Sequence, residues 1–150
     1  MQPIRDALMF RGRLTRLGYW RWQIALLLIA AGITYAAVLL TMTGAPRWVA
    51  ALAFTPMAVA LLAAAGVIAR RLHDRGRAAW WLLIFVVAPW GLAALSILFA
   101  EQSPPIDPAW TTPVILFTTL ASMALNVWGF VEIGLLRGSA EANRFGPAPV

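Results

Sequence analysis

Long apolar runs alternate with short polar breaks along the chain, and this pattern predicts four helices. The runs cover about 23–43, 48–69, 79–99 and 111–136. A helix of roughly 20 apolar residues crosses the hydrocarbon layer of a membrane. No run shows the period of two that is typical of a barrel strand, and backbone groups have to be paired within lipid. We therefore expect an all-α, polytopic transmembrane helical bundle of four spans, forming a single membrane domain over 1–150.

The breaks between the runs are rich in proline and glycine. Gly44-Ala45-Pro46 predicts a turn after the first span, and Ser103–Pro108 separates the third span from the fourth. Pro56, Pro89 and Pro113 lie within or near spans. A proline there predicts a kink or a helix start, because it lacks the backbone donor that a helix interior uses.

The arginines predict the orientation of the four spans. All twelve basic residues are arginine, and with four spans all of them except Arg47 fall on the same side. Glu101 and Asp107 fall on the other side. The positive-inside rule then makes both termini cytoplasmic. The cytoplasmic parts are expected to be the N-terminal segment 1–22, the loop 70–78 and the tail 137–150.

Aromatic residues stand at the expected cytoplasmic ends of two spans. Tyr19 and Trp20 begin the first span, and Trp80 and Trp81 begin the third. Rings with one polar edge collect at the membrane interface. We interpret these four residues as interface anchors.

Composition narrows the class of protein. The chain is 61% hydrophobic, which is typical of a membrane protein, and it has no cysteine, which excludes disulfides and thiolate chemistry. With a single histidine, His73, a metal site is not expected, and no motif indicates a cofactor. The net charge of +6 favours anionic lipid headgroups as partners over nucleic acid in a chain this apolar.

Three separated motifs occur in the polar parts of the chain: FRGRLTRLGYW at 10–20, RRLHDRGRAAWW at 70–81 and NRFGPAP at 143–149. In order and placement they resemble the bacterial inner-membrane family catalogued as domain of unknown function 805. The resemblance covers essentially the whole chain. It implies a small multi-pass protein of the bacterial inner (cytoplasmic) membrane, and it implies no established reaction.

The chain departs from the family pattern at several positions. Gly18 stands where an acidic residue is usual before the aromatic pair. Arg75 and Ala78-Ala79 replace small polar residues after His-Asp, and the connection 101–113 is longer than the compact form of the family.

The charged cluster of 70–81 is the candidate working surface. Arg70 and Arg71 precede Asp74 by four and three residues, spacings that bring side chains together on a helix. One interpretation is topological, with arginines holding the loop in the cytoplasm. A sharper hypothesis is that Arg13 and Arg16 converge with Arg70 and Arg71 on a pocket for an anionic lipid or a partner carboxylate. The candidate lipid- or partner-binding residues are Arg13, Arg16, Arg70, Arg71, His73, Asp74 and Arg77.

Two polar residues fall within the fourth span. A carboxylate at membrane depth marks a functional candidate, so Glu132 is either a structural ion pair, with Arg137 or the 70–71 arginines, or a proton or cation site. For Asn126 an interhelical hydrogen bond is expected. For His73, beside Asp74, structural hydrogen bonding is favoured over a protonation switch.

The tail is rich in glycine, alanine and proline, a composition that is typical of disorder. Its motif nevertheless favours docking onto the basic loop 70–78. The residues of this motif are Asn143, Arg144, Phe145, Gly146 and Pro147.

These features favour a non-enzymatic accessory subunit whose basic cytoplasmic face binds anionic lipid or docks to a larger membrane complex. Other membrane proteins or a homo-oligomer are further partner classes. One alternative is a small transporter or channel subunit that uses Glu132 and Asn126. Another is a lipid-acting membrane enzyme with His73 and Asp74 as acid and base.

Overall fold

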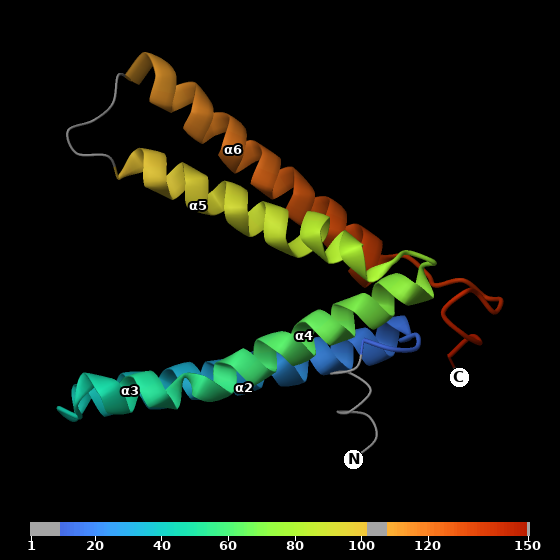
Figure 1. Ribbon diagram of the computed structural model, residues 1–150, viewed down its shortest axis with the longest axis horizontal. Coiled ribbons are helices and arrows are strands. Elements are labelled where there is room, and N and C mark those ends of the chain that lie inside the picture. Colours follow the sequence, from blue (N-terminus) through green and yellow to red (C-terminus); the bar gives the residue numbers. More distant parts are fainter. Residues whose placement is uncertain (1–9, 102–107, 150) are drawn as a thin grey trace. The chain divides into compact units, whose positions relative to one another are not determined.

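The computed structural model describes residues 10–101 and 108–149, and its regular elements are helical (Figure 1). Among these residues there is no strand, only an isolated bridge between Asn143 and Gly146. Four stretches are long and apolar enough to cross a membrane. The prediction of an all-helical chain with four such helices is therefore confirmed. These stretches are Arg16–Met42, Arg47–Asp74, Ala79–Ala100 and Ala109–Leu135.

Large apolar side chains on these helices are exposed. Leu27, Leu61, Trp90 and Phe117 each keep more than half of their surface accessible. A water-soluble domain rarely exposes apolar patches on this scale, whereas a lipid-facing helix has no need to bury them. The helix surfaces therefore agree with a multi-pass membrane protein.

The chain forms two compact units, Met1–Ala79 with Arg137–Val150 and Trp80–Leu136. The single membrane domain expected from the sequence stays a prediction. In the first unit, α2 (Arg16–Met42) lies beside α4 (Thr55–Asp74), and the short helix α3 (Arg47–Ala53) connects to α4 (Figure 1).

Helix α2 begins at Arg16 rather than at residue 23, so the expected N-terminal segment 1–22 is already helical in its last part. The reason is the residue before the helix. The side chain of Thr15 accepts a hydrogen bond from the backbone N–H of Gly18 at 3.0 Å, which caps the first turn.

The second span is interrupted near its start and is longer than the predicted 48–69. The chain leaves α3 at Phe54 and starts α4 at Thr55, with Pro56 in the first turn, where a missing N–H has no intrahelical acceptor to lose. Helix α4 continues to Asp74, so the first half of the expected loop 70–78 is helical.

Helix α4 ends in a glycine turn. Gly76 has a φ of +72°, and the N–H of Arg77 donates back to the carbonyl of Leu72 at 2.9 Å, as in a Schellman motif. This turn, rather than the predicted boundary at residue 69, sets the end of the helix. As a result Arg70, Arg71, His73 and Asp74 all lie on the final helical turns.

In the second unit, α5 (Ala88–Ala100) packs against α6 (Pro108–Gly129). The third span is irregular at its start, with a 3-10 turn at Ala79–Trp81 and a π-helical turn at Leu83–Val87 just before Pro89. In a regular α-helix the ring of a proline clashes with the carbonyl four residues earlier. The wider π-helical turn before Pro89 makes room for that ring. A second π-helical turn, Phe130–Leu135, ends the fourth span.

Small and hydroxylated residues join α5 to α6. The Ser122 hydroxyl donates to the carbonyl of Pro89 at 2.9 Å, and that of Thr118 donates to Ser96 Oγ at 3.2 Å. A Cβ at Gly129 would lie 3.2 Å from the ring of Phe85, so the backbone of α6 passes close to that ring. Hydroxyl bonds and close backbone approach are the usual means by which membrane helices associate.

Candidate functional site

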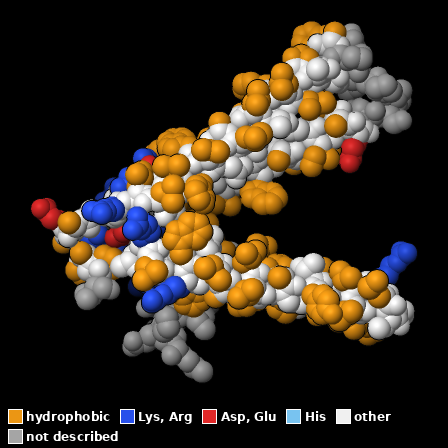
Figure 2. All heavy atoms as spheres, turned by 180° about the vertical axis from the view of Figure 1, so that it is seen from behind, with side chains coloured by type: hydrophobic (Ala, Val, Ile, Leu, Met, Phe, Trp, Pro, Cys, Tyr) orange, Lys and Arg blue, Asp and Glu red, His pale blue; other side chains and the backbone are white. Residues whose placement is uncertain are grey.

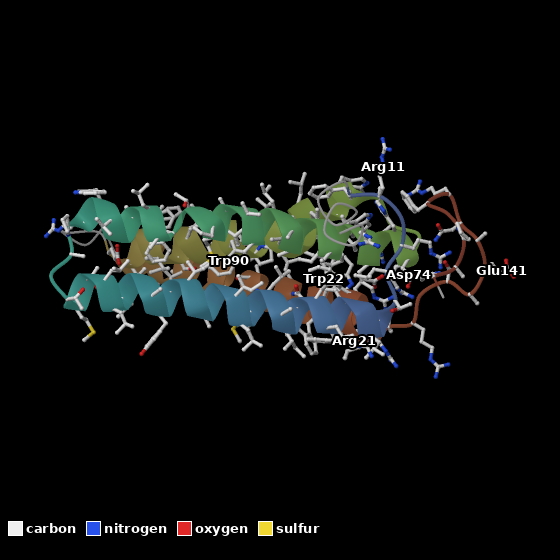
Figure 3. All side chains as sticks on the ribbon, turned by 90° about the horizontal axis from the view of Figure 1, so that it is seen from below. Arg11, Arg21, Trp22, Asp74, Trp90 and Glu141 are labelled. Carbon is white, nitrogen blue, oxygen red and sulfur yellow. The ribbon has the colours of Figure 1, made fainter. Side chains whose placement is uncertain are left out.

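The carboxylate of Asp74, at the end of α4, is held between two arginines. Arg13 donates to Oδ1 through Nε at 3.1 Å and through Nη2 at 2.9 Å. Arg71 donates to Oδ2 through Nη1. All three residues are buried: Arg13 is 7% exposed, Arg71 0% and Asp74 3%. We call them the Asp74 ion-pair cluster, and Figure 3 shows Asp74 at the end of its helix.

Arg13 also holds the C-terminal tail. Its Nη1 donates to the backbone carbonyls of Glu141 at 2.7 Å and Gly146 at 3.3 Å, and its Nη2 donates to that of Ser139. A guanidinium offers five N–H donors in a rigid plane, so one side chain can serve a carboxylate and several carbonyls together. Arg13 therefore joins the segment before α2, the end of α4 and the tail.

The tail in turn caps the exposed carbonyls of α4. Ser139 donates to the Asp74 carbonyl through its N–H at 2.9 Å and its hydroxyl at 3.2 Å. Asn143 Nδ2 donates to the carbonyl of His73 at 2.9 Å, and Arg144 Nη2 to that of Gly76 at 3.2 Å. The last carbonyls of a helix have no intrahelical donor, and here the tail supplies one.

His73 packs between the two ends of the chain. Its ring stacks on Phe145 with centroids 4.0 Å apart and an interplanar angle of 7°. Its Nδ1 lies 3.1 Å from the carbonyl oxygen of Gly12, so a protonated Nδ1 donates there. The imidazole thus faces Phe145 and Gly12, while the carboxylate of Asp74 faces arginines. Among the described contacts, no hydrogen bond joins these two side chains, and a role for them as acid and base stays a prediction.

The NRFG motif forms a tight turn of its own. The backbones of Asn143 and Gly146 exchange two hydrogen bonds, at 3.1 and 2.9 Å, and the N–H of Phe145 donates to Asn143 Oδ1 at 2.9 Å. Gly146 has a φ of +126°, which favours glycine. The guanidinium carbon of Arg144 lies 4.7 Å from the centroid of the Phe145 ring. The turn thereby presents Phe145 to His73.

An open cavity of about 460 Å³ lies beside the Asp74 ion-pair cluster. Three arginines and one carboxylate contribute to its wall, and that carboxylate already pairs with Arg13 and Arg71. We call it the basic cavity. It is lined by Thr15, Arg16, Leu17, Arg71, Asp74, Arg137, Gly138, Ser139, Ala140, Ala148 and Pro149.

The four arginines expected to converge have different places. Arg13 and Arg71 meet at Asp74, and Arg16 lines the basic cavity. Arg70 does not line the basic cavity, and its buried Nε has no hydrogen-bond partner in the described part of the chain. Its backbone carbonyl instead accepts from the N–H of Leu14 at 3.2 Å. Arg77 contributes its N–H to the turn after α4.

Several residues of the site carry no signal in the sequence. Gly138 is one, because a Cβ there would stand 1.8 Å from Oδ2 of Asp74. Arg137 and Ser139 are others, since only the folding of the tail brings them to the cavity. The role of Thr15 can be predicted from the sequence, because threonine is a common N-cap residue before a helix.

The polar residues of the second unit are placed differently from the expectation. The Asn126 amide donates to the carbonyl of Ser122 on its own helix at 2.9 Å, so the expected interhelical bond is not seen among the described residues. Glu132 is 5% exposed in the terminal π-helical turn, and its role stays a prediction.

The aromatic residues chosen as anchors form ring pairs. Tyr19 meets Trp20 edge to face at 5.4 Å, and Trp80 stacks with Trp81 at 4.8 Å. Tyr19 is buried, whereas Trp80 is 55% exposed. Their placement at a membrane interface stays a prediction.

In the described part of the chain, four helices are long and apolar enough to cross a membrane, which suggests the class of multi-pass membrane proteins. Residues 7–147 match the family model described as Protein of unknown function (DUF805), and the chain belongs to this family. The resemblance of the three motifs is thereby confirmed. No curated protein and no solved structure matches the chain.

The close approach at Gly138 leads to a first prediction. Gly138→Ala should detach the tail from the Asp74 ion-pair cluster, because the added methyl group collides with a carboxylate that two arginines hold in place. Limited proteolysis of the purified protein should cut within 137–149 at least about tenfold faster, a change worth about 1.4 kcal/mol of docking free energy. Gly32→Ala is the matched control, since nothing lies within 4 Å of a Cβ there. Equal cleavage rates in the two variants would contradict the close approach of Gly138 to the Asp74 carboxylate.

Proposed function

We propose that the protein is a non-enzymatic integral protein of a bacterial inner membrane whose basic end binds the phosphate headgroups of anionic lipids. The observation that carries this proposal is the basic cavity. Its one lining carboxylate, Asp74, pairs with Arg13 and Arg71, and Arg16 and Arg137 add further positive charge to the wall. Among the described residues, arginines therefore outnumber carboxylates in the wall of the cavity.

The position of the cavity along the helix axes favours a lipid headgroup over a soluble anion as the ligand. Helix α2 begins at Arg16 and α4 ends at Asp74, so the cavity lies where two apolar helices meet their polar ends. Lipid phosphates occupy this level of a membrane. Figure 2 shows blue side chains gathered toward one end of the hairpin that α2 and α4 form, while Arg47 belongs to the other end, where α3 begins.

The chemistry of the lining residues also suits phosphate. Guanidinium groups bind phosphate oxygens through two parallel N–H donors. Thr15 and Ser139 add hydroxyl groups to the wall of the cavity. Leu17 lies in the first turn of α2, where backbone N–H groups have no intrahelical acceptor.

The contacts favour a binding role over catalysis or transport. Both oxygens of Asp74 accept from arginine, and His73 faces Gly12 and Phe145, so the partners of both side chains suit a structural role. In the second unit, the Ser122 hydroxyl and the Asn126 amide bond backbone carbonyls. The first bond joins α6 to α5 and the second lies within α6, so both groups have structural partners.

The proposed orientation has both termini and the α4 turn in the cytoplasm. It is supported by the arginines, of which all except Arg47 belong to the side of the chain that holds the basic cavity in a four-span arrangement. Anionic lipid at the cytoplasmic surface attracts such arginines. The same basic face is the surface that the protein would offer to an acidic partner in a larger membrane complex.

The orientation is tested with reporters. A reporter fused after Val150 is expected to give the signal of a cytoplasmic location. The reason is that an even number of spans returns the chain to its starting side. A reporter placed after Gly44, in the first predicted turn, serves as the control and should give the opposite signal. An extracytoplasmic signal at Val150 would contradict the proposal.

Lipid binding is tested by charge removal inside and outside the cavity. We expect Arg16→Gln/Arg137→Gln to lower the preference for an anionic over a zwitterionic phospholipid by at least about tenfold, since each charge-assisted hydrogen bond contributes about 1.5–3 kcal/mol. Native mass spectrometry of the protein in neutral detergent, with each lipid added in turn, measures this preference. High salt during the titration screens long-range attraction.

The matched control is Arg11→Gln/Arg21→Gln, which removes the same charge. Both side chains are exposed and point away from the helix pair, and neither lines the cavity (Figure 3). We expect this variant to change the preference by less than about threefold, because neither side chain lines the cavity and an exposed charge away from the bound headgroup is screened. Equal losses in the two variants would show that net charge alone attracts the lipid and would overturn the cavity assignment.

A further inference from the structure

A second, apolar hollow lies between the same two helices that hold the basic cavity. Its volume is about 360 Å³, and we call it the apolar groove. Trp22, Leu26 and Ile29 line it from α2, and Val59, Ala60 and Ala63 line it from α4. The alanines create the hollow, because they stand opposite large side chains and leave depth between the helices.

We infer that the basic cavity and the apolar groove together hold one anionic phospholipid. Its phosphate would lie against Arg16 and Arg137, and one acyl chain would lie along Ala60 and Ala63. This inference rests on the proposed function and adds to it a lipid chain as part of the ligand.

The spacing of the two hollows fits a single lipid. On α2, six residues separate Arg16 from Trp22, or about 9 Å, and the groove continues to Ile29, about 20 Å from Arg16. On α4, the groove begins at Ala63, about 17 Å from Asp74. One leaflet contributes about 15 Å of the hydrocarbon core. The groove thus begins within the depth that the acyl chains of that leaflet occupy.

The chemistry and size of the groove favour an acyl chain. Every lining residue is apolar, so the groove offers water no hydrogen-bond partner. A helix from a second copy is about 10–12 Å wide with its side chains, which is too broad for a hollow of about 360 Å³ set between two packed helices. A flexible chain of methylene groups is thin enough to enter.

The test compares two anionic lipids that share a headgroup and differ in chain length. One is a phosphatidylglycerol with chains of about 16 carbons, and the other is its dihexanoyl analogue. Each is titrated into the protein in neutral detergent and followed by native mass spectrometry. We expect the wild-type protein to bind the long-chain lipid at least about tenfold more tightly, because burying methylene groups favours binding.

Filling the groove should remove this chain-length preference. Ala60→Leu is expected to lower the affinity for the long-chain lipid about tenfold and to leave the affinity for the dihexanoyl analogue within about twofold. Ala58→Leu is the matched control on the same helix, because Ala58 is exposed and does not line the groove. Ala63→Val is a milder filling variant, to be used if Ala60→Leu does not fold.

The outcomes separate the two proposals. If the filling variants keep the full chain-length preference while the Arg16 and Arg137 substitutions still abolish headgroup selectivity, the groove assignment is overturned and the headgroup site stands. If the wild-type protein binds neither anionic lipid in preference to a zwitterionic one, the proposed function fails, and the groove assignment fails with it.

Discussion

The structure of the first unit depends on the carboxylate of Asp74. This single carboxylate forms ion pairs with two buried guanidinium groups, Arg13 from before α2 and Arg71 from the preceding turn of α4. Removing charged groups from water is costly, and a buried ion pair compensates for that cost only with good geometry and further hydrogen bonds. Arg13 meets this condition through its bonds to the tail carbonyls. The docking of the tail is therefore a consequence of burying Arg13.

This arrangement divides the arginines into two kinds. Arg13 and Arg71 serve the fold, because both bind the carboxylate of Asp74. Arg16 and Arg137 instead line the basic cavity. In this account, lipid binding depends on both pairs of arginines. The ion-pair cluster holds the tail in place, and the tail supplies Arg137 and Ser139 to the wall where a phosphate would bind.

Much of the fold follows from simple constraints on membrane helices. The length of the apolar runs predicts the four helices, and the spacing of Arg71 and Asp74 predicts their pairing on one helical turn. Helix ends are harder to predict, because they depend on local bonds. The cap at Thr15 and the turn at Gly76 move the ends of α2 and α4 well beyond the apolar runs.

The partners of the Asp74 carboxylate are harder to predict from the sequence than the helices are. Arg13 lies 61 residues away from it in the sequence, and no periodicity connects positions so far apart. The requirement for glycine at 138 arises only from the approach of the tail to the carboxylate. The sequence predicts one side of the membrane for all four arginines, and from this we expected them to converge. The fold instead pairs two of them with Asp74 and places Arg16 alone of the other two in the cavity wall.

The coupling free energy between Arg13 and Asp74 is the most direct test of this account. It is obtained from the free energies of unfolding in detergent of Arg13→Met, Asp74→Asn and the double variant. Asp74→Asn alone should lower the stability by about 3–5 kcal/mol, because it leaves two buried arginines without a counter-charge. We expect the double variant to recover about 2 kcal/mol relative to the sum of the two single effects. A parallel cycle with Arg16→Gln should give a coupling below about 0.5 kcal/mol, and additive effects of Arg13 and Asp74 would contradict the account.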